Sequence, residues 1–401
     1  MDKPSNHYKN VLHGFFLSIG TTIAEPSTIL PLIVNHFGGS SLLVGFFASL
    51  LRGGAILVQL FAAFKAQNYP LMLPFIRRVF FIRFLAWFFI GLSIILLGDS
   101  HPNITLFCIG LGLFVFSFSA GFGAIYFKDI IAKIFSHKFR GKTMAYRQFF
   151  SAFGGLLSGT LAAIVLEHFP APQSYGYLFI ISSFVMGFGY IAFGTIDEPV
   201  KEDIPKKENS FTLFLQNSLK ILREDKELQI QLSTFLLAYA YLISLPFIIL
   251  DAQTKIALDG VAIGSLITTQ MVGAMLSNLI WGKLSGNGRN RLTANISIAL
   301  QIVAISLAFS ASSIYEYMLL FFIVGGAVDG NRIASGNLIL KLAPPQKRPV
   351  YVALQINIIS FGLFFSLLGG LILQISSYTI LYSLTLLLLS AALLLSFKLK
   401  D

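Results

Sequence analysis

Charged residues are scarce in this sequence, and cysteine is nearly absent. Only 12% of the 401 residues are Asp, Glu, Lys or Arg, whereas a soluble domain usually carries about a quarter. The single cysteine, Cys108, excludes an internal disulfide framework and a cysteine-based metal site. No Gly-x-x-x-x-Gly-Lys-Ser/Thr run occurs, so a phosphate-binding loop of that type is excluded. The alternating strands typical of outer-membrane barrels are missing as well.

The sequence consists largely of long apolar segments. Hydrophobic residues make up 55% of the chain, and the mean hydropathy is +0.77. A run of roughly 20 apolar residues spans the bilayer as a helix, because lipid offers the backbone no hydrogen-bond partners. We therefore predict an all-α membrane protein with twelve transmembrane helices, over residues 10–34, 41–64, 76–97, 103–127, 143–166, 175–194, 230–250, 261–282, 293–312, 317–340, 350–373 and 377–397. The first segment lacks a small-residue cleavage site, so we expect no cleaved signal peptide.

Lysine and arginine are distributed unequally between the two sides of the predicted helices. The N-terminus, the even-numbered connections and the C-terminal tail hold nearly all of the 29 basic residues, and the opposite loops contain only Lys255. By the positive-inside rule, both termini are expected in the cytoplasm. A basic face beside anionic lipid explains the net charge of +11 without a nucleic-acid partner.

The longest polar segment divides the predicted spans into two groups of six. We predict an N-terminal six-helix bundle over residues 1–194, a cytoplasmic linker over 195–229 and a C-terminal six-helix bundle over 230–401. In the linker, apolar residues from Phe211 to Leu222 recur at helical spacing, which predicts a short amphipathic helix on the inner membrane surface.

The two predicted halves are related in sequence. Residues 133–140 align with residues 341–348, with lysine and arginine in the same register. Continuing that register aligns Gly154 with Gly362 and Ser158 with Ser366. Two pseudo-symmetric halves with a site between them are typical of secondary transporters.

A pair of prolines adds to this repeat. Pro31 lies late in the first predicted span, and Pro246 lies at a similar place in the seventh. Each is expected to remove one backbone hydrogen bond and to loosen its helix.

Over essentially its full length, the chain resembles the major facilitator superfamily. Residues 282–291 resemble the superfamily's glycine- and arginine-rich cytoplasmic loop, and residues 121–124 resemble the end of a motif found in proton-coupled members. Gly154, Gly155 and Gly159 resemble the glycine-rich fifth span of drug antiporters. The resemblance implies that spans 1, 4, 7 and 10 line a central cavity, supported by spans 2, 5, 8 and 11.

Five charged residues fall inside spans that the resemblance places at this cavity: Glu25, Arg52, Arg147, Asp329 and Arg332. A charge near the bilayer centre costs at least about 2.5–3.5 kcal/mol, so each needs a partner or a function. Glu25 and Arg52 are expected at similar depth, either as a static ion pair or as a site for a proton or a cationic substrate group. Thr21 and Thr22 are expected to support that site, beside a carbonyl freed by Pro26.

Asp329 and Arg332 are three residues apart and share one helix face. They are expected either to satisfy each other or to form a substrate or proton site in the C-terminal half. Mid-span amides are expected to add hydrogen-bonding capacity, and the supporting set is Gln270, Asn331 and Asn357.

Charges near the inner ends of the spans predict gating contacts. Asp129 and Arg147 are expected to pair as a cytoplasmic gate or brace between spans 4 and 5. Arg140 and Arg348, which are equivalent in the repeat, are expected to join ion pairs at the same face.

The expected function is secondary transport of a small solute by alternating access, coupled to protons. Two acids against three arginines inside the spans give a mild preference for an organic anion. The alternatives are a drug/proton efflux antiporter and a non-transporting sensor or assembly factor on the same scaffold. An enzyme is not expected, because neither paired histidines nor clustered Asp and His occur at one interface, and no cofactor or metal site is expected. We expect a monomer in a bacterial cytoplasmic membrane.

Overall fold

The computed structural model describes residues 2–23, 27–56, 58–59, 61–62, 69–200, 220–344 and 348–400. The side chains of Arg52 and Arg348 lie outside this description. Within the described residues the chain is almost entirely helical and has no strand. Ten of these helices are long and apolar enough to cross a membrane. The predicted class, an all-α membrane protein, is therefore confirmed.

The chain divides into two compact units. Unit 1 contains residues 1–40, 47–207 and 258–268, and unit 2 contains residues 41–46, 208–257 and 269–401. The predicted boundaries of the two bundles and of the linker remain predictions. Most of the predicted amphipathic helix lies outside the described residues.

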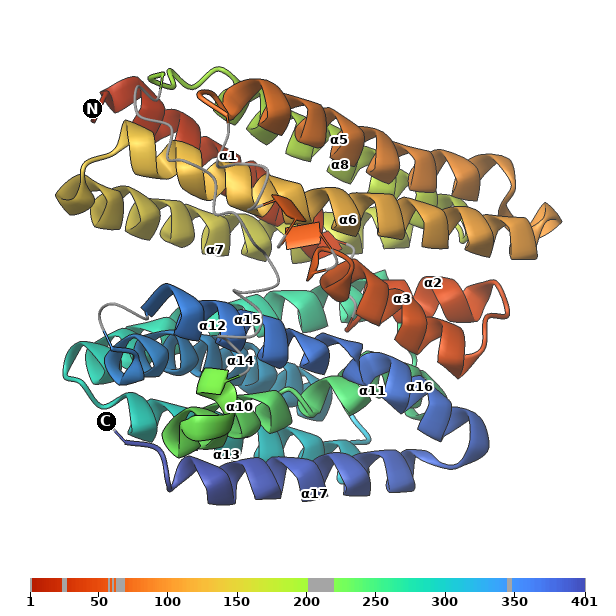
Figure 1. Ribbon diagram of the computed structural model, residues 1–401. Coiled ribbons are helices and arrows are strands. Elements are labelled where there is room, and N and C mark those ends of the chain that lie inside the picture. The colour runs from red at the N-terminus through yellow and green to blue at the C-terminus, as the bar shows by residue number, and fades with distance from the viewer. Residues whose placement is uncertain are drawn as a thin grey trace. The chain divides into compact units, whose positions relative to one another are not determined.

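Unit 1 consists mainly of long helices lying side by side (Figure 1). They are α1 (Pro4–Ile23), α2 (Ile29–His36), α5 (Leu73–Leu96), α6 (Pro102–Ile134), α7 (His137–His168) and α8 (Gln173–Gly194), with α3 (Ser41–Gly53) shared with unit 2. Helix α1 packs against α7 and α8, and α5 packs against α6 and α8. Pro102 begins α6 at a position where no backbone donor is needed.

Unit 2 is built from the remaining helices. They are α10 (Lys226–Ala238), α11 (Tyr241–Lys255), most of α12 (Gly260–Gly286), α13 (Asn290–Ser310), α14 (Ile314–Leu342), α15 (Arg348–Ser360), α16 (Phe365–Ile375) and α17 (Tyr378–Ser396). Helix α13 packs against α14 and α17, and α10 contacts α14, α15 and α17. A capping box at Ser313 and Glu316 begins α14.

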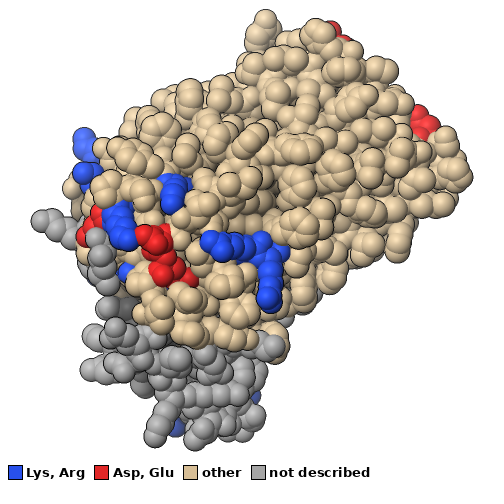
Figure 2. Space-filling view, turned by 90° about the horizontal axis from the view of Figure 1, so that it is seen from above, with Lys and Arg blue, Asp and Glu red and all other residues tan. Residues whose placement is uncertain are grey.

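One face of unit 1 carries few charges. Figure 2 looks onto the side of the molecule where α1, α5 and α8 lie, and most of that surface is uncharged. Lysine and arginine side chains gather at one end, and acidic side chains are seen at both ends. An uncharged band flanked by charge is what a helix bundle exposes to lipid.

Within the described residues, four of the predicted spans are interrupted, although each was expected as one helix. In the second predicted span, α3 ends at Gly53 and residues 54–55 form a turn. The first consists of α1 and α2, the seventh of α10 and α11, and the eleventh of α15 and α16 joined by a 3₁₀ turn over Phe361–Phe364. At the break in the seventh span, the Ala240 amide donates to the Leu237 carbonyl at 2.9 Å, and the Leu242 amide donates to the Tyr239 carbonyl at 2.9 Å. These tighter turns break the regular α-helical ladder.

The two prolines differ in their effect. Pro31 is the third residue of α2, in the first turn, where a helix has no use for the missing donor. Within α2 it therefore removes no hydrogen bond, and the prediction that it loosens the first span stays a prediction. Pro246 lies inside α11 and leaves the Leu242 carbonyl without its usual partner, and the Ser366 hydroxyl donates to that carbonyl at 3.0 Å.

The sequence repeat has a structural counterpart in each unit. Ser158 on α7 donates to the Ile19 carbonyl of α1 at 2.9 Å, as Ser366 on α16 does to Leu242. Glycines precede both serines by four residues, and an added Cβ at Gly154 would lie 2.6 Å from the Phe15 carbonyl oxygen. At Gly362, the equivalent Cβ would lie 2.5 Å from the Cβ atom of Tyr239. Both halves therefore use one glycine for close approach and one serine for a cross-helix bond.

Replacing Ser366 by alanine is expected to lower the free energy of unfolding by about 1 kcal/mol, because the Leu242 carbonyl then has no donor. Ser158→Ala should cost less, because Ile19 lies within α1 and receives a bond from its own helix. Thermal unfolding in detergent measures both. In a Pro246→Ala background the Ser366→Ala change should become nearly silent. An undiminished effect there would contradict this account.

Candidate substrate site

An ion pair and an amide meet on α14 in unit 2. Arg332 donates to Oδ1 of Asp329 at 2.8 Å, and Asn278 on α12 donates to Oδ2 at 2.7 Å. The Asp329 side chain is only 15% exposed, and the Arg332 side chain is 63% exposed. The expected local pairing of these two residues is confirmed. It leaves the carboxylate satisfied at both oxygens and the guanidinium at an accessible surface.

The same arginine lines a cavity of about 320 Å³ whose walls all belong to unit 2. The cavity lies among α10, α11, α13, α14 and α15, and its apolar part includes Phe235, Tyr239 and Tyr241. The rings of Tyr239 and Tyr241 have centroids 6.3 Å apart. A volume of this size lies at the lower end of the usual range for small-molecule sites.

Four amide side chains surround or line this cavity, and they fall into two groups. Gln355 is fully engaged: its Nε2 donates to the Ser335 carbonyl at 3.1 Å and to the Ser335 hydroxyl, and its Oε1 accepts from Gln231 at 3.3 Å. Gln301 and Asn331 also line the cavity and are 1% and 7% exposed, yet among the described residues neither amide has a hydrogen-bond partner at its nitrogen or its oxygen. Buried amides are rarely left in this condition.

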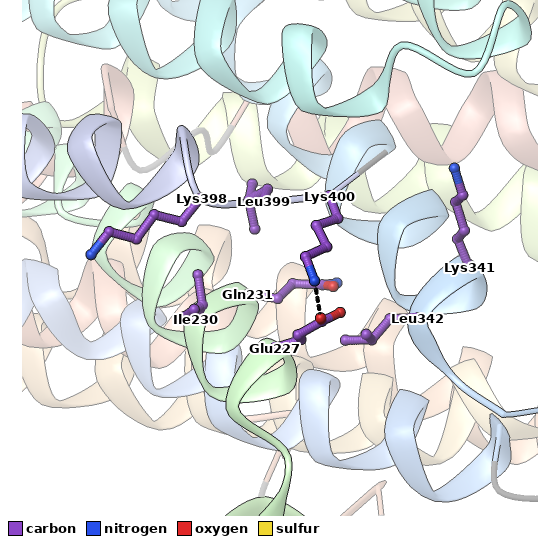
Figure 3. A pocket seen from close by; sticks show the side chains of 8 residues that line it. All are labelled: Glu227, Ile230, Gln231, Lys341, Leu342, Lys398, Leu399 and Lys400. Carbon is purple, nitrogen blue, oxygen red and sulfur yellow. Dashed lines mark hydrogen bonds and ion pairs between the residues drawn. The ribbon is translucent and has the colours of Figure 1, made fainter.

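A second, basic hollow of about 230 Å³ lies at the end of unit 2 (Figure 3). Lys400 pairs with Glu227, whereas Lys341 and Lys398 point away from that pair and from each other. Gln231 lines this hollow and bonds to Gln355, so a pair of amides connects it with the larger cavity. Lysines that diverge in this way do not form a compact anion site.

Unit 1 holds a buried arginine–histidine contact. Arg147 on α7 donates to the Asn10 carbonyl at 2.8 Å and lies 2.8 Å from Nδ1 of His13, both on α1. Its guanidinium also stacks over the ring of Phe127 at 4.8 Å. His13 is buried among aromatic rings, and the nearest centroid is that of Phe193 at 5.0 Å. In the part of unit 1 that is described, no carboxylate contacts Arg147.

The predicted pairing of Asp129 with Arg147 is therefore wrong. Asp129 pairs with Lys133, one turn further along α6, at 2.7 Å. A partner four residues away on the same helix is closer than one on a neighbouring helix. Arg140 donates to the carbonyls of Ala132 and Phe135, so it caps the end of α6 rather than pairing with an acid.

Lys133 belongs to a cluster at the end of unit 1. Glu198, whose side chain is 1% exposed, accepts from Lys133 at 2.7 Å and from the backbone amides of Met72 and Leu73 at 2.7–3.0 Å. It thus satisfies the first amides of α5. Beside it, the exposed Asp197 pairs with Lys3, and this contact holds the pKa of the Asp197 carboxyl below its ordinary value.

The other predicted site residues are placed as follows. Glu25 and the side chains of Arg52 and Arg348 lie outside the described residues. Thr21 donates to the Leu17 carbonyl of its own helix at 2.9 Å, and Thr22 is buried. Gln270 is buried, and Asn357 is half-buried. No group of three His, Cys, Asp or Glu residues placed to hold a metal ion occurs in the described ranges.

Two residues of interest were not predicted. Gln301 lies in the ninth span, which the family resemblance turns away from the cavity. Its amide in mid-span was the available signal. His13 lies at the end of the first span, and nothing in the linear sequence places it beside Arg147, because 134 residues separate the two.

The helices and their apolar surfaces together describe a polytopic membrane protein. The sequence profile of the Major Facilitator Superfamily matches residues 11–251 and again residues 230–401. The chain belongs to this superfamily, and it is a secondary carrier that sits in a membrane and binds small molecules. No curated protein matches the sequence.

Solved structures share the fold at low sequence identity. A crystal structure of the nucleoside transporter NupG has a TM-score of 0.76 and 11% identity, covering 99% of this chain and all of that one. An auto-inhibited POT family peptide transporter has a TM-score of 0.74 and 12% identity, covering 99% and 96%. A bacterial homologue of the iron transporter ferroportin, in an inward-facing state, has a TM-score of 0.70 and 13% identity, covering 99% of both chains.

Proposed function

We propose that this carrier couples the movement of a small organic anion to protons, by alternating access, in a bacterial cytoplasmic membrane with both termini in the cytoplasm. The observation that carries the proposal is the position of Arg332. This arginine lines the cavity of unit 2 while its guanidinium is held by Asp329. One cation therefore lies between two possible anionic partners, the protein's own carboxylate and a solute.

Protonation of Asp329 decides between these partners. While ionised, Asp329 holds Arg332 at 2.8 Å and accepts from Asn278 at 2.7 Å. The neutral acid no longer attracts Arg332, which becomes free to bind a carboxylate in the cavity. The Asn278 amide suits either state, because its oxygen accepts a hydrogen bond from the protonated acid once the amide has turned.

Charge pairing then couples proton and anion. The unliganded state contains the Asp329–Arg332 pair, and the loaded state contains a neutral Asp329 with Arg332 paired to the solute. A loaded site with an ionised Asp329 has excess negative charge, and a protonated site without solute leaves Arg332 unpaired. The Asp329 side chain is only 15% exposed, so an ionised Asp329 beside an additional anion is disfavoured, and the two charge-balanced states are preferred.

Unit 1 supports the preference for an anion. The described partners of Arg147 are the carbonyl and side chain of Asn10, the ring of His13 and the ring of Phe127, and none of them carries a negative charge. Glu25 and Arg52 remain the predicted counterpart site in this half. The proposed protonation of Asp329 involves residues of unit 2 alone and does not depend on Glu25 or Arg52.

Uptake into proteoliposomes tests the proposal. Purified protein is reconstituted, a pH gradient with an alkaline interior is imposed, and radiolabelled organic anions and cationic drugs are compared. We expect an organic anion to accumulate inside and a protonophore to abolish the accumulation. Cationic drugs driven by the opposite gradient would indicate efflux instead. No flux of any solute would favour a sensor or assembly factor.

A further inference from the structure

The two unpartnered amides in unit 2 point to a more specific solute. Gln301 and Asn331 come from adjacent helices, α13 and α14, and line one cavity. Both side chains are more than nine-tenths buried, and all four of their polar atoms lack a partner in the part of the chain that the structure describes. By contrast, Gln355 in the wall of the same cavity is bonded to Ser335 and Gln231. The hydrogen bonds of Gln355 are thus formed without Gln301 and Asn331.

An amide presents a donor and an acceptor side by side, and its natural complement is another amide edge. Two such groups line a cavity that also carries Tyr239 and Tyr241, whose rings suit a flat molecule. Arg332 lines the same cavity and matches a carboxylate. We propose that the cavity of unit 2 binds a planar organic acid that carries an amide-type edge, with Gln301 and Asn331 recognising that edge. This inference rests on the proposed function for the role of Arg332.

A glycine keeps the cavity open. A Cβ atom added at Gly336, which lines the cavity on α14, would meet no atom within 4 Å. A leucine there would project into free space without breaking a contact. Gly282 on α12 is equally unobstructed but does not line the cavity, so it offers a matched control.

Binding to the purified full-length protein in detergent tests the assignment with three probes. Orotate has both a carboxylate and amide edges, benzoate has the carboxylate alone, and uracil has the amide edges alone. We expect orotate to bind at least about tenfold more tightly than either of the others. Gln301→Leu and Asn331→Leu should each remove most of the preference for orotate over benzoate and leave benzoate binding unchanged. Gly336→Leu should weaken both acids.

Controls separate recognition from folding. Asn295→Leu, on α13 but outside the cavity, and Gly282→Leu should leave all three affinities unchanged. Gln301→Leu and Asn331→Leu should keep the wild-type unfolding temperature, because no hydrogen bond is lost, whereas Gln355→Leu should lower it. A fall in the unfolding temperature for Gln301→Leu or Asn331→Leu would assign these amides a structural role and overturn the proposal.

Two further outcomes distinguish this inference from the function on which it rests. If benzoate binds as tightly as orotate, or if the leucine variants keep the preference, the amides hold only water and the inference fails. Proton-driven uptake of anions would still stand in that case. If no anion is taken up and no acid binds, the proposed function fails with it.

Discussion

Asp329→Asn is expected to disconnect transport from the pH gradient. For one proton moved with one anion, a gradient of one pH unit supports about tenfold accumulation, and the variant should bring this ratio to about one. Asparagine keeps the shape of Asp329 and its contact with Asn278 but has no proton to exchange. Initial uptake rates and steady-state accumulation, measured in proteoliposomes at several imposed gradients, check the prediction.

The stability of this variant should change little. Arg332 is well exposed, so its charge reaches solvent once the pair is broken, and exposed pairs contribute about 1 kcal/mol or less. Asp251 is a matched control in the same unit: it is buried and pairs with Lys255 at 2.9 Å, but it lies outside the cavity. Asp251→Asn should leave the pH dependence of uptake intact. Unchanged proton-driven accumulation in Asp329→Asn would rule out this residue as the coupling site.

Glu198→Ala is expected to cause the largest loss of stability, about 3 kcal/mol. The change removes the acceptor for Lys133 and for the backbone amides of Met72 and Leu73 at the start of α5, and the side chains of Lys133 and Glu198 are only 12% and 1% exposed. Breaking a buried pair from one side typically costs about 3–5 kcal/mol. Lys133 keeps Asp129, so the lower part of that range applies. Thermal or denaturant unfolding in detergent measures the loss.

The adjacent acid provides the control for Glu198. Asp197 is exposed and pairs with the equally exposed Lys3, so Asp197→Ala should not change the unfolding midpoint measurably. Glu198→Gln should fall between wild type and Glu198→Ala, because its one carbonyl oxygen still accepts a bond. If Asp197→Ala and Glu198→Ala lowered the stability equally, burial of the carboxylate would not determine the loss of stability at this end of unit 1.

The local pairing at Asp329 and Arg332 was accessible to prediction, because both residues lie on one turn of one helix. The pairing of Asp129 with Arg147 was predicted wrongly for a related reason. Several partners at similar depth compete for one charge, and the rotation of each helix decides among them. A sequence gives the depth of a residue along a span, but not the direction in which the packed helix turns its side chain.

The breaks in the first, seventh and eleventh spans illustrate the same limit. An apolar run of the right length predicts a span, but residues 237–242, where the tight turns occur, include no proline or glycine that would indicate a break. The sequence alone showed a glycine and a serine at equivalent positions of the two halves. Their purpose, close approach and a bond to a facing carbonyl, appeared only with the neighbouring helix in place.

The sequence by itself determined the membrane class, the predicted spans, the repeat and the family resemblance, because hydrophobicity and charge act on each segment independently of its neighbours. Only the tertiary structure decided which polar groups are satisfied. Gln301, Asn331 and Gln355 are similar amides in apolar helices, yet Gln355 is fully bonded while the other two face a cavity without partners. Hydrogen bonds depend on distance and direction in three dimensions, and the fold sets both.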